Sequence, residues 1–164
     1  MGLEILDKMN KIAKAFGNII HGDDTKGGTY KDKLAILESS NNYNENSVSG
    51  IYGKYQFGNS RLDDYRKATK DDFSNEKFLN DPQLQETVMD WSVTNIDDYI
   101  NQYDLEKYIG KKIKGITITR EGIYAGAHLG GRFGMRKFLE SGGKDDPKDK
   151  FKTTISNYFE EFSN

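Results

Sequence analysis

The residues of this chain that suit chemistry are mostly carboxylates. The chain has two histidines, His21 and His128, and no cysteine, so neither histidine has a second ligand at the spacing of a metal site. The sequence also lacks the Gly-x-Ser-x-Gly turn of serine hydrolases and the glycine-rich phosphate loop that ends in Gly-Lys. We therefore expect no metal and no cofactor, and the chemistry that remains is general acid–base catalysis by Asp or Glu.

Glu38 is the carboxylate whose position best suits a general acid. It follows the apolar stretch Leu34–Leu37 at the predicted end of a helix, and a polar, aromatic loop begins directly after it. A carboxyl group packed partly against apolar surface keeps its proton more readily, as a general acid requires. The same position is also typical of a solvated glutamate at a helix end, and both interpretations stay open on this evidence.

Two further polar residues follow Glu38 at fixed distances. Ser47 comes nine positions later, and Gln56, the last residue of Gly53-Lys54-Tyr55-Gln56, comes eighteen positions later. This arrangement resembles the catalytic segment of the soluble lytic transglycosylases, in the lysozyme-like superfamily. That family reads Glu-Ser-x, then a Ser nine positions after the Glu, then Gly-Leu-Met-Gln ending eighteen positions after it. Here Ser39 follows Glu38, and the spacing matches without a gap.

A later segment, Ala127-His128-Leu129-Gly130-Gly131, resembles the Ala-Tyr-Asn-Ala-Gly segment of the same family, with His128 and Leu129 in place of Tyr and Asn. From residue 30 to residue 162, about four-fifths of the chain also looks like the peptidoglycan-hydrolase domains of phage tails and secretion-system effectors. That likeness rests on four segments: Gly53-Lys54-Tyr55-Gln56-Phe57-Gly58, Phe78-Leu79-x-Asp81-Pro82, Ala127–Gly131 and Phe138-Leu139-x-Ser141-Gly142-Gly143.

The resemblance implies a bacteriolytic muramidase, which cleaves the β-1,4 bond between N-acetylmuramic acid (MurNAc) and N-acetylglucosamine (GlcNAc) in peptidoglycan. Lytic transglycosylases need one carboxylate, so Glu38 would donate a proton and then accept one, and the product would be a 1,6-anhydro sugar. Hydrolysis by a lysozyme is the alternative, and such glycosidases usually pair two carboxylates. Glu45, in the loop after Glu38, and Glu121, ahead of His128, are the candidates for a second carboxylate, although each also suits an ordinary structural position.

Six residues are further candidates for binding substrate: Ser47, Gln56, Tyr43, Tyr55, Tyr124 and His128. The serine and the glutamine suit hydrogen bonds to the acetamido group or to Glu38, and the histidine, at the family's Tyr position, suits the same roles. The tyrosines have flat faces and hydroxyls for sugars, but ordinary packing explains each equally well. The departures at His128 and Leu129 leave open a non-catalytic module that binds glycan or forms a structural part of a phage tail or secretion apparatus.

The composition limits the other functions. The chain has 164 residues with 24 Lys and Arg against 26 Asp and Glu, a formal net charge of −2. A general nucleic-acid binder needs a basic excess, and no apolar stretch approaches the roughly 20 residues of a membrane span. Charged residues interrupt the N-terminus, so no secretory signal peptide is recognisable. We expect a monomer made in the cytoplasm that acts on peptidoglycan strands in the periplasm or outside the cell, with delivery machinery or an immunity protein as candidate partners.

The helices and turns expected around these residues indicate a mainly α fold, of the α+β lysozyme-like type. It is a helical domain with one small β-hairpin or loop lobe after the catalytic helix. Residues 1–28 are predicted to form an amphipathic helix and linker, and residues 29–164 the catalytic domain. Thr29 and Asp32 predict a capping box for the helix that ends near Glu38, and glycines among aromatic residues predict a short hairpin or an ordered loop over 50–58. Later helices are predicted to start at Ser60, Ser74, Asp81-Pro82, Tyr103, Thr119, Met135 and Ile155, with a strand-like stretch over 113–118.

The helix predicted after Thr119 carries a run of small residues, Ala125-Gly126-Ala127, and Gly130-Gly131 is predicted to end it. Small side chains permit another segment to approach the helix closely. The candidates for that segment are the catalytic helix, the glycan and an ordinary packing neighbour.

Overall fold

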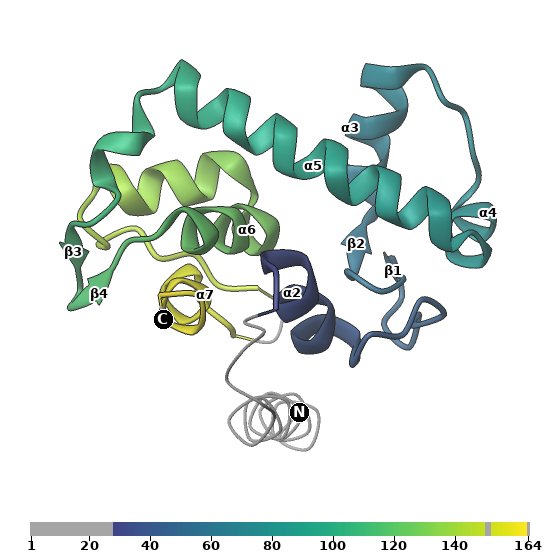
Figure 1. Cartoon of the computed structure of the whole chain (residues 1–164), viewed down its shortest axis with the longest axis horizontal. Coiled ribbons are helices and arrows are strands. Elements are labelled where there is room, and N and C mark those ends of the chain that lie inside the picture. Colours follow the sequence, from purple (N-terminus) through teal and green to yellow (C-terminus); the bar gives the residue numbers. More distant parts are fainter. Residues whose placement is uncertain (1–27, 150–151, 164) are drawn as a thin grey trace. The chain divides into compact units, whose positions relative to one another are not determined.

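The computed structural model describes residues 28–149 and 152–163 (Figure 1). Within these residues the protein is mainly helical and has two small antiparallel hairpins. This confirms the predicted fold class, mainly helical with a small β lobe. The chain divides into two compact units, residues 1–92 and 93–164, and the division falls within the long helix α5 (Pro82–Gln102). Residues 1–27, which include the predicted N-terminal helix, lie outside the described part.

The first unit begins with α2 (Tyr30–Ser39), the helix that carries Glu38. Thr29 caps it as predicted: its hydroxyl accepts from the Asp32 N–H, and the Asp32 carboxylate accepts from the Thr29 N–H at 3.0 Å. Four residues of the helix are buried in the core: Tyr30, Leu34, Ala35 and Leu37. The helix ends where Ser40 adopts a left-handed conformation with φ of 56°, so Glu38 lies in its last turn.

A short hairpin follows, made of β1 (Ile51–Tyr52) and β2 (Phe57–Gly58), which confirms the hairpin predicted over 50–58. Its turn needs a positive φ at Gly53 (79°), which glycine adopts without strain, and at Gln56 (53°). The helix α3 (Asn59–Thr69) begins directly after β2, so its N-cap is Gly58 and not the predicted Ser60. The helix starts early because the hairpin pairing ends at Gly58, whose extended backbone leads straight into the first turn.

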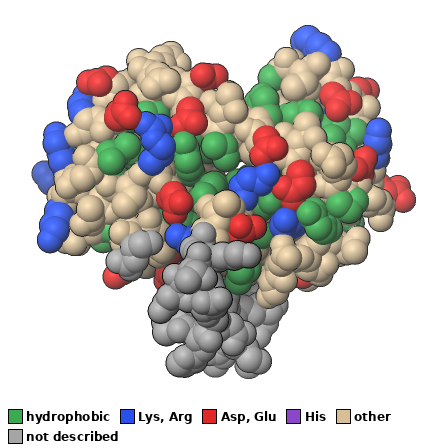
Figure 2. Space-filling view, in the orientation of Figure 1, with side chains coloured by type: hydrophobic (Ala, Val, Ile, Leu, Met, Phe, Trp, Pro, Cys, Tyr) green, Lys and Arg blue, Asp and Glu red, His purple; other side chains and the backbone are tan. Residues whose placement is uncertain are grey.

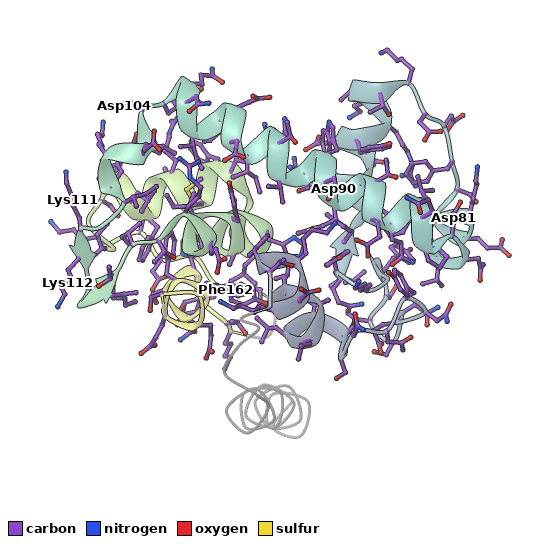
Figure 3. All side chains as sticks on the ribbon, viewed as in Figure 1. Asp81, Asp90, Asp104, Lys111, Lys112 and Phe162 are labelled. Atoms are coloured by element: carbon purple, nitrogen blue, oxygen red, sulfur yellow. The ribbon has the colours of Figure 1, made fainter. Side chains whose placement is uncertain are left out.

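The helices α4 (Asn75–Asn80) and α5 both begin where predicted. The Ser74 hydroxyl and the Asp81 carboxylate each accept a hydrogen bond from a backbone N–H of the following first turn. Figure 3 shows Asp81 at the start of α5. The core of this unit is rich in aromatic rings, and the buried ones are Tyr30, Tyr55, Phe57, Tyr65, Phe73 and Phe78.

The second unit holds the rest of α5 and a set of later elements: the 3-10 helix η1 (Leu105–Tyr108), β3 (Lys112–Ile113), β4 (Ile116–Thr117), α6 (Arg120–Glu140) and α7 (Ile155–Glu161). The helix predicted over 103–109 is thus confined to the single turn of η1. β3 and β4 pair into a hairpin, which accounts for the strand-like stretch over 113–118. Thr119 caps α6 as predicted, since its hydroxyl accepts from the Gly122 N–H at 2.9 Å.

The helix α6 does not end at Gly130-Gly131 as predicted. Gly131 has φ of 74° and ψ of 162°, which interrupts the helical geometry, but the helix resumes directly and continues to Glu140. The separate helix predicted near 135–139 is therefore the second half of α6. The chain continues in the same direction because the apolar residues after the kink, Met135, Phe138 and Leu139, are buried in the same core as those before it.

Glycines at every fourth position of α6 let α7 pack closely against it. A Cβ at Gly122 or Gly126 would come within 2.9 or 2.7 Å of the Phe159 ring, and one at Gly130 would overlap with the Ile155 side chain. The sequence left three candidates for the segment that approaches Ala125-Gly126-Ala127: the catalytic helix, the glycan and an ordinary packing neighbour. In the structure α7, a packing neighbour, approaches Gly126.

Candidate active site

Glu38 is half-buried in the last turn of α2. The hydroxyl of its neighbour Ser39 donates to the Lys54 carbonyl at 2.7 Å and accepts from the Asn42 N–H at 2.9 Å. Ser39 thus joins the end of the helix both to the loop that follows it and to the turn of the hairpin. These contacts fix the helix end that carries Glu38 against the hairpin turn.

Ser47 and Gln56, the two residues spaced nine and eighteen positions after Glu38, both form hydrogen bonds to Glu45. Its carbonyl accepts from the Gly53 N–H at 2.7 Å and from the Gln56 side-chain amide at 3.3 Å. Its carboxylate accepts from the Ser47 N–H at 2.9 Å and also from the Ser47 hydroxyl. The loop after α2 therefore folds back onto the hairpin turn through Glu45.

Glu38 and Glu45, two carboxylates of the first unit, thus lie on segments that both contact the hairpin turn. Glu38 lies at a helix end that Ser39 bonds to the turn, and Glu45 lies in a loop that Gln56 bonds to the same turn. Ser47, with two hydrogen bonds to one oxygen of Glu45, orients that carboxylate.

Gln85, near the start of α5, is fully buried and binds the loop and the hairpin together. Its side-chain nitrogen lies 2.9 Å from the Tyr43 carbonyl and 3.1 Å from the Phe78 carbonyl, and its side-chain oxygen accepts from the Lys54 N–H at 2.8 Å. A Cβ at Gly53 would overlap with the same side chain. Glycine is therefore needed at position 53 for space as well as for its positive φ, and Gln85 sets the position of the hairpin turn.

Glu86, the next residue of α5, is the centre of a charged and aromatic cluster. Its carboxylate accepts hydrogen bonds from the Tyr43 hydroxyl at 2.8 Å, the Tyr55 hydroxyl at 2.9 Å and the Lys54 ammonium at 2.9 Å. The Lys54 ammonium also lies 4.8 Å from the centroid of the Tyr43 ring. One carboxylate therefore binds the loop and the hairpin turn to α5.

Lys31 extends this cluster to the helix that carries Glu38. Its ammonium lies 3.0 Å from Glu86 and 2.6 Å from Asp90, one turn further along α5 (Figure 3). We call the residues of this network the Glu86 cluster: Lys31, Tyr43, Lys54, Tyr55 and Glu86. It connects α2, the loop, the hairpin turn and α5, which are the segments that surround the candidate residues of this unit.

The cluster shifts the pKa of its members. Burial by itself raises the pKa of Glu86, but hydrogen bonds from Lys54, Lys31 and the two tyrosines outweigh it and lower this pKa from 4.5 to about 2. Burial and the hydrogen bond to Glu86 raise the pKa of Tyr55 to about 12. Burial alone lowers the pKa of Lys54, but its bonds to Glu86 and Tyr43 outweigh burial and raise it. Glu86 is therefore a permanent anion near pH 7, which suits a structural centre and not a proton-transfer group.

Sequence reasoning missed Gln85 and Glu86. A signal exists for Gln85, because it lies three and four positions before Val88 and Met89 on the buried face of α5. A polar residue on such an apolar stripe indicates a buried hydrogen-bonding role. Glu86 lies beside that stripe and has the sequence pattern of an ordinary solvated glutamate, so only its tertiary contacts reveal it.

The structure corrects the role predicted for Tyr55. This residue is 1% exposed, and its ring packs edge-on against Phe57 with centroids 6.3 Å apart. The ring therefore serves the core and offers no face to a sugar, while its hydroxyl binds Glu86. Tyr43 is half-buried and binds Glu86 in the same way.

Three predicted residues lie on α6 in the second unit: Glu121, Tyr124 and His128. The Tyr124 hydroxyl donates to Asp97 at 2.6 Å, and Arg120 forms an ion pair with the same carboxylate at 2.9 Å. Burial and the hydrogen bond to Asp97 raise the pKa of Tyr124 to about 12, so it stays protonated. Glu121 lies in the first turn of α6, where the helix dipole favours an acidic residue, and His128 is half-buried.

Among the described residues, no three His, Cys, Asp or Glu side chains are arranged to bind a metal ion. None of the helices in the described ranges is long and apolar enough to cross a membrane. Comparisons of the chain with protein-family models, with curated proteins and with solved structures return no significant match. Function must therefore be inferred from the residues of the candidate site.

Proposed function

We propose that the protein is a peptidoglycan-cleaving muramidase of the lytic transglycosylase type, acting on the β-1,4 bond between MurNAc and GlcNAc. The observation that carries the proposal is the spacing of Glu38, Ser47 and Gln56, which agrees with that family without a gap. Their contacts support it, because Ser39, Ser47 and Gln56 all form hydrogen bonds within one assembly of helix end, loop and hairpin turn.

In the proposed reaction, Glu38 donates its proton to the glycosidic oxygen that leaves C1 of MurNAc. The acetamido oxygen of the same sugar stabilises the positive charge that develops at C1. The ionised Glu38 then accepts the proton of the muramyl 6-hydroxyl, whose oxygen attacks C1 and closes the 1,6-anhydro ring. One carboxylate serves as acid and then as base, and no water is consumed.

Direct hydrolysis is the second candidate, and the setting of Glu45 favours it. Ser47 binds the Glu45 carboxylate through both its N–H and its hydroxyl, which gives that carboxylate a defined orientation. A second carboxylate held in this way would activate water or stabilise C1, as in lysozymes that pair two carboxylates. Glu121 lies in the first turn of α6, where the helix dipole already accounts for an acidic residue, so Glu45 is the better candidate.

Digestion of purified peptidoglycan sacculi tests the proposal. The wild-type protein should release fragments with 1,6-anhydro ends, identified by mass. Glu38→Gln should slow their release by roughly 10²–10⁴-fold, the usual contribution of a general acid. Glu76→Gln is the matched control, since Glu76 is an exposed residue of α4, and it should leave the rate unchanged.

Three results would change the assignment. Equal release by the wild type and by Glu38→Gln would refute the role of Glu38. Reducing ends in place of anhydro ends would show hydrolysis, and Glu45→Gln should then be inactive as well. Binding to sacculi without release of fragments would identify a non-catalytic glycan-binding or structural module.

A further inference from the structure

The second unit carries a surface on which aromatic and basic side chains alternate, and the proposed reaction does not use it. It is formed by the end of α5 with the residue that follows, and by the second half of α6. We call it the aromatic-basic patch, and its residues are Tyr99, Tyr103, Arg132, Phe133, Arg136 and Lys137. Phe133 is 58% exposed and Tyr103 is 37% exposed, and they are the two exposed large hydrophobic side chains among the described residues.

Core packing does not account for Phe133. On the second half of α6 the residues that face the core are Met135, Phe138 and Leu139, each no more than 1% exposed. Phe133 lies on the face that also carries the basic residues, one, three and four positions away from them. Aromatic rings gathered on a charged helix face are typical of a binding surface.

The basic groups lie over the rings. The Arg136 guanidinium carbon is 4.1 Å from the centroid of the Tyr103 ring and 5.6 Å from that of Phe133. The Lys137 ammonium is 5.1 Å from the Phe133 centroid. Cation–π attraction therefore keeps rings and charges interleaved at the surface, where the long basic side chains would otherwise extend into solvent.

The patch is positive in a chain whose formal net charge is −2. Between residues 132 and 140 there are three basic residues and one acidic residue, Glu140, whose carboxylate forms an ion pair with Arg136 Nε at 3.6 Å, so basic residues outnumber acidic ones by two. On the α5 side, Asp104 forms an ion pair with Lys107 at 3.5 Å. Acidic and basic side chains are interspersed over the face of the protein in Figure 2. The patch therefore favours an anionic partner that also has apolar surface.

We propose that the aromatic-basic patch binds a peptidoglycan strand through residues other than those of the candidate active site. The identity of this polymer rests on the proposed function. The C–H face of a sugar packs against the electron-rich face of an aromatic ring, and Phe133, the more exposed of the two rings at 58%, provides that contact. The carboxylates of the stem peptides pair with Arg136 and Lys137, and a guanidinium binds a carboxylate through two parallel hydrogen bonds. A second contact on the same polymer raises the effective concentration of glycan at the enzyme.

Other occupants fit the patch less well. A second copy of the chain would bring two positive patches together. A nucleic acid would meet a protein without the basic excess that displaces phosphate counterions. A membrane surface would need a broad aliphatic face, whereas the exposed apolar groups here are the two rings.

Equilibrium binding to purified sacculi tests this proposal, with Glu38→Gln present in every protein so that the polymer stays intact. The double variant Phe133→Ser, Lys137→Glu removes an exposed ring and reverses an exposed charge, and it should weaken binding roughly tenfold. Lys112→Glu reverses a charge elsewhere in the same unit, on β3 (Figure 3), and should change the affinity less than about twofold. Amidation of the stem-peptide carboxylates should weaken binding of the protein with an intact patch, and should weaken binding of the double variant less, because that variant keeps only the arginines of the patch.

The proposal is overturned if the double variant binds as Lys112→Glu does, or if amidation changes nothing. Tighter patch-dependent binding of single-stranded DNA than of sacculi would also overturn it, and would show a nucleic-acid surface. The digestion assay detects failure of the proposed function independently of the patch. In that case the protein with native Glu38 releases no fragments from sacculi, with or without the patch substitutions. Patch-dependent binding without release would keep the patch and make the protein a glycan-binding module.

Discussion

Replacing Glu86 with Gln removes one negative charge from the Glu86 cluster and keeps the size and shape of the side chain. The amide oxygen still accepts hydrogen bonds from the two tyrosine hydroxyls. Lys54 and Lys31, however, lose the anion that lies 2.9 and 3.0 Å from their ammonium groups. The Glu86→Gln variant therefore tests the charge of the cluster and not its packing.

The pKa of Glu86 sets the size of the effect and its dependence on pH. Its decrease from 4.5 to about 2 corresponds to at most about 3 kcal/mol of stabilisation at pH 7, at roughly 1.4 kcal/mol per pKa unit. Because the side chain is 24% exposed and solvent screens its ion pairs, we expect a loss of about 2 kcal/mol in the free energy of unfolding. The folded state has the lower pKa, so this contribution is complete above about pH 4.5 and is lost as the pH falls through about 2.

Urea denaturation at pH 7 and pH 3 measures this difference. Glu86→Gln should be less stable than the wild type by about 2 kcal/mol at pH 7, and by less than about half of that at pH 3. The other carboxylates titrate in both proteins and cancel in the comparison. The exposed control Glu76→Gln should stay within about 0.5 kcal/mol of the wild type at both pH values.

Two results would refute this reasoning. An equal loss of stability at pH 3 and pH 7 would show that the variant disturbs packing and that charge contributes little. No loss at pH 7 would show that the ion pairs gain nothing over solvation of their separate charges.

Two further substitutions test the packing of each unit. Gly126→Ala places a methyl group 2.7 Å from the Phe159 ring and should cost about 1–2 kcal/mol, because overpacking outweighs the gain in helix propensity. Thermal unfolding of both variants measures this cost. Gly134→Ala is the control, since the nearest neighbours of the added methyl group are 3.5 Å away, and it should be neutral or stabilising. Equal effects of the two alanines would contradict the close approach of α7. Gln85→Leu removes the partner of the Lys54 N–H in the hairpin turn and of the Tyr43 carbonyl, and should cost about 2–4 kcal/mol in urea denaturation. Its exposed neighbour Gln83→Leu should cost less than about 0.5 kcal/mol, and a Gln85→Leu protein as stable as the wild type would show that the amide bonds are dispensable.

The starts of the helices were predictable wherever a side chain caps them. Thr29, Ser74, Asp81 and Thr119 each accept a hydrogen bond from the first turn of the helix that follows, and all four helices begin as predicted. Prediction failed at Ser60, because the strand pairing ends at Gly58 and the helix starts two residues earlier than predicted, and it failed at Gly131. There a glycine with positive φ kinks α6 without ending it, because the apolar residues beyond it belong to the same core.

The sequence names candidate residues for the site, but it does not predict their contacts. The spacing of Glu38, Ser47 and Gln56 indicates one site, and the structure shows that the last two bind Glu45. The burial of Tyr55 was not predictable, since alternating aromatic residues in a hairpin suit either face until a core covers one of them. The role of Glu38 in catalysis stays a proposal for the sacculus assay.

The sequence by itself determined the helical class, the caps and the hairpin over 50–58. These features depend on residues within a few positions of one another, so a linear pattern contains them. Only the tertiary structure decided the partners of Glu86, which lie 31 to 43 positions away in the case of Tyr43, Lys54 and Tyr55. It also decided which glycines of α6 meet α7 and which aromatic rings stay exposed beside basic groups. Such contacts arise when distant segments pack, and burial then turns an ordinary glutamate into the centre of a cluster.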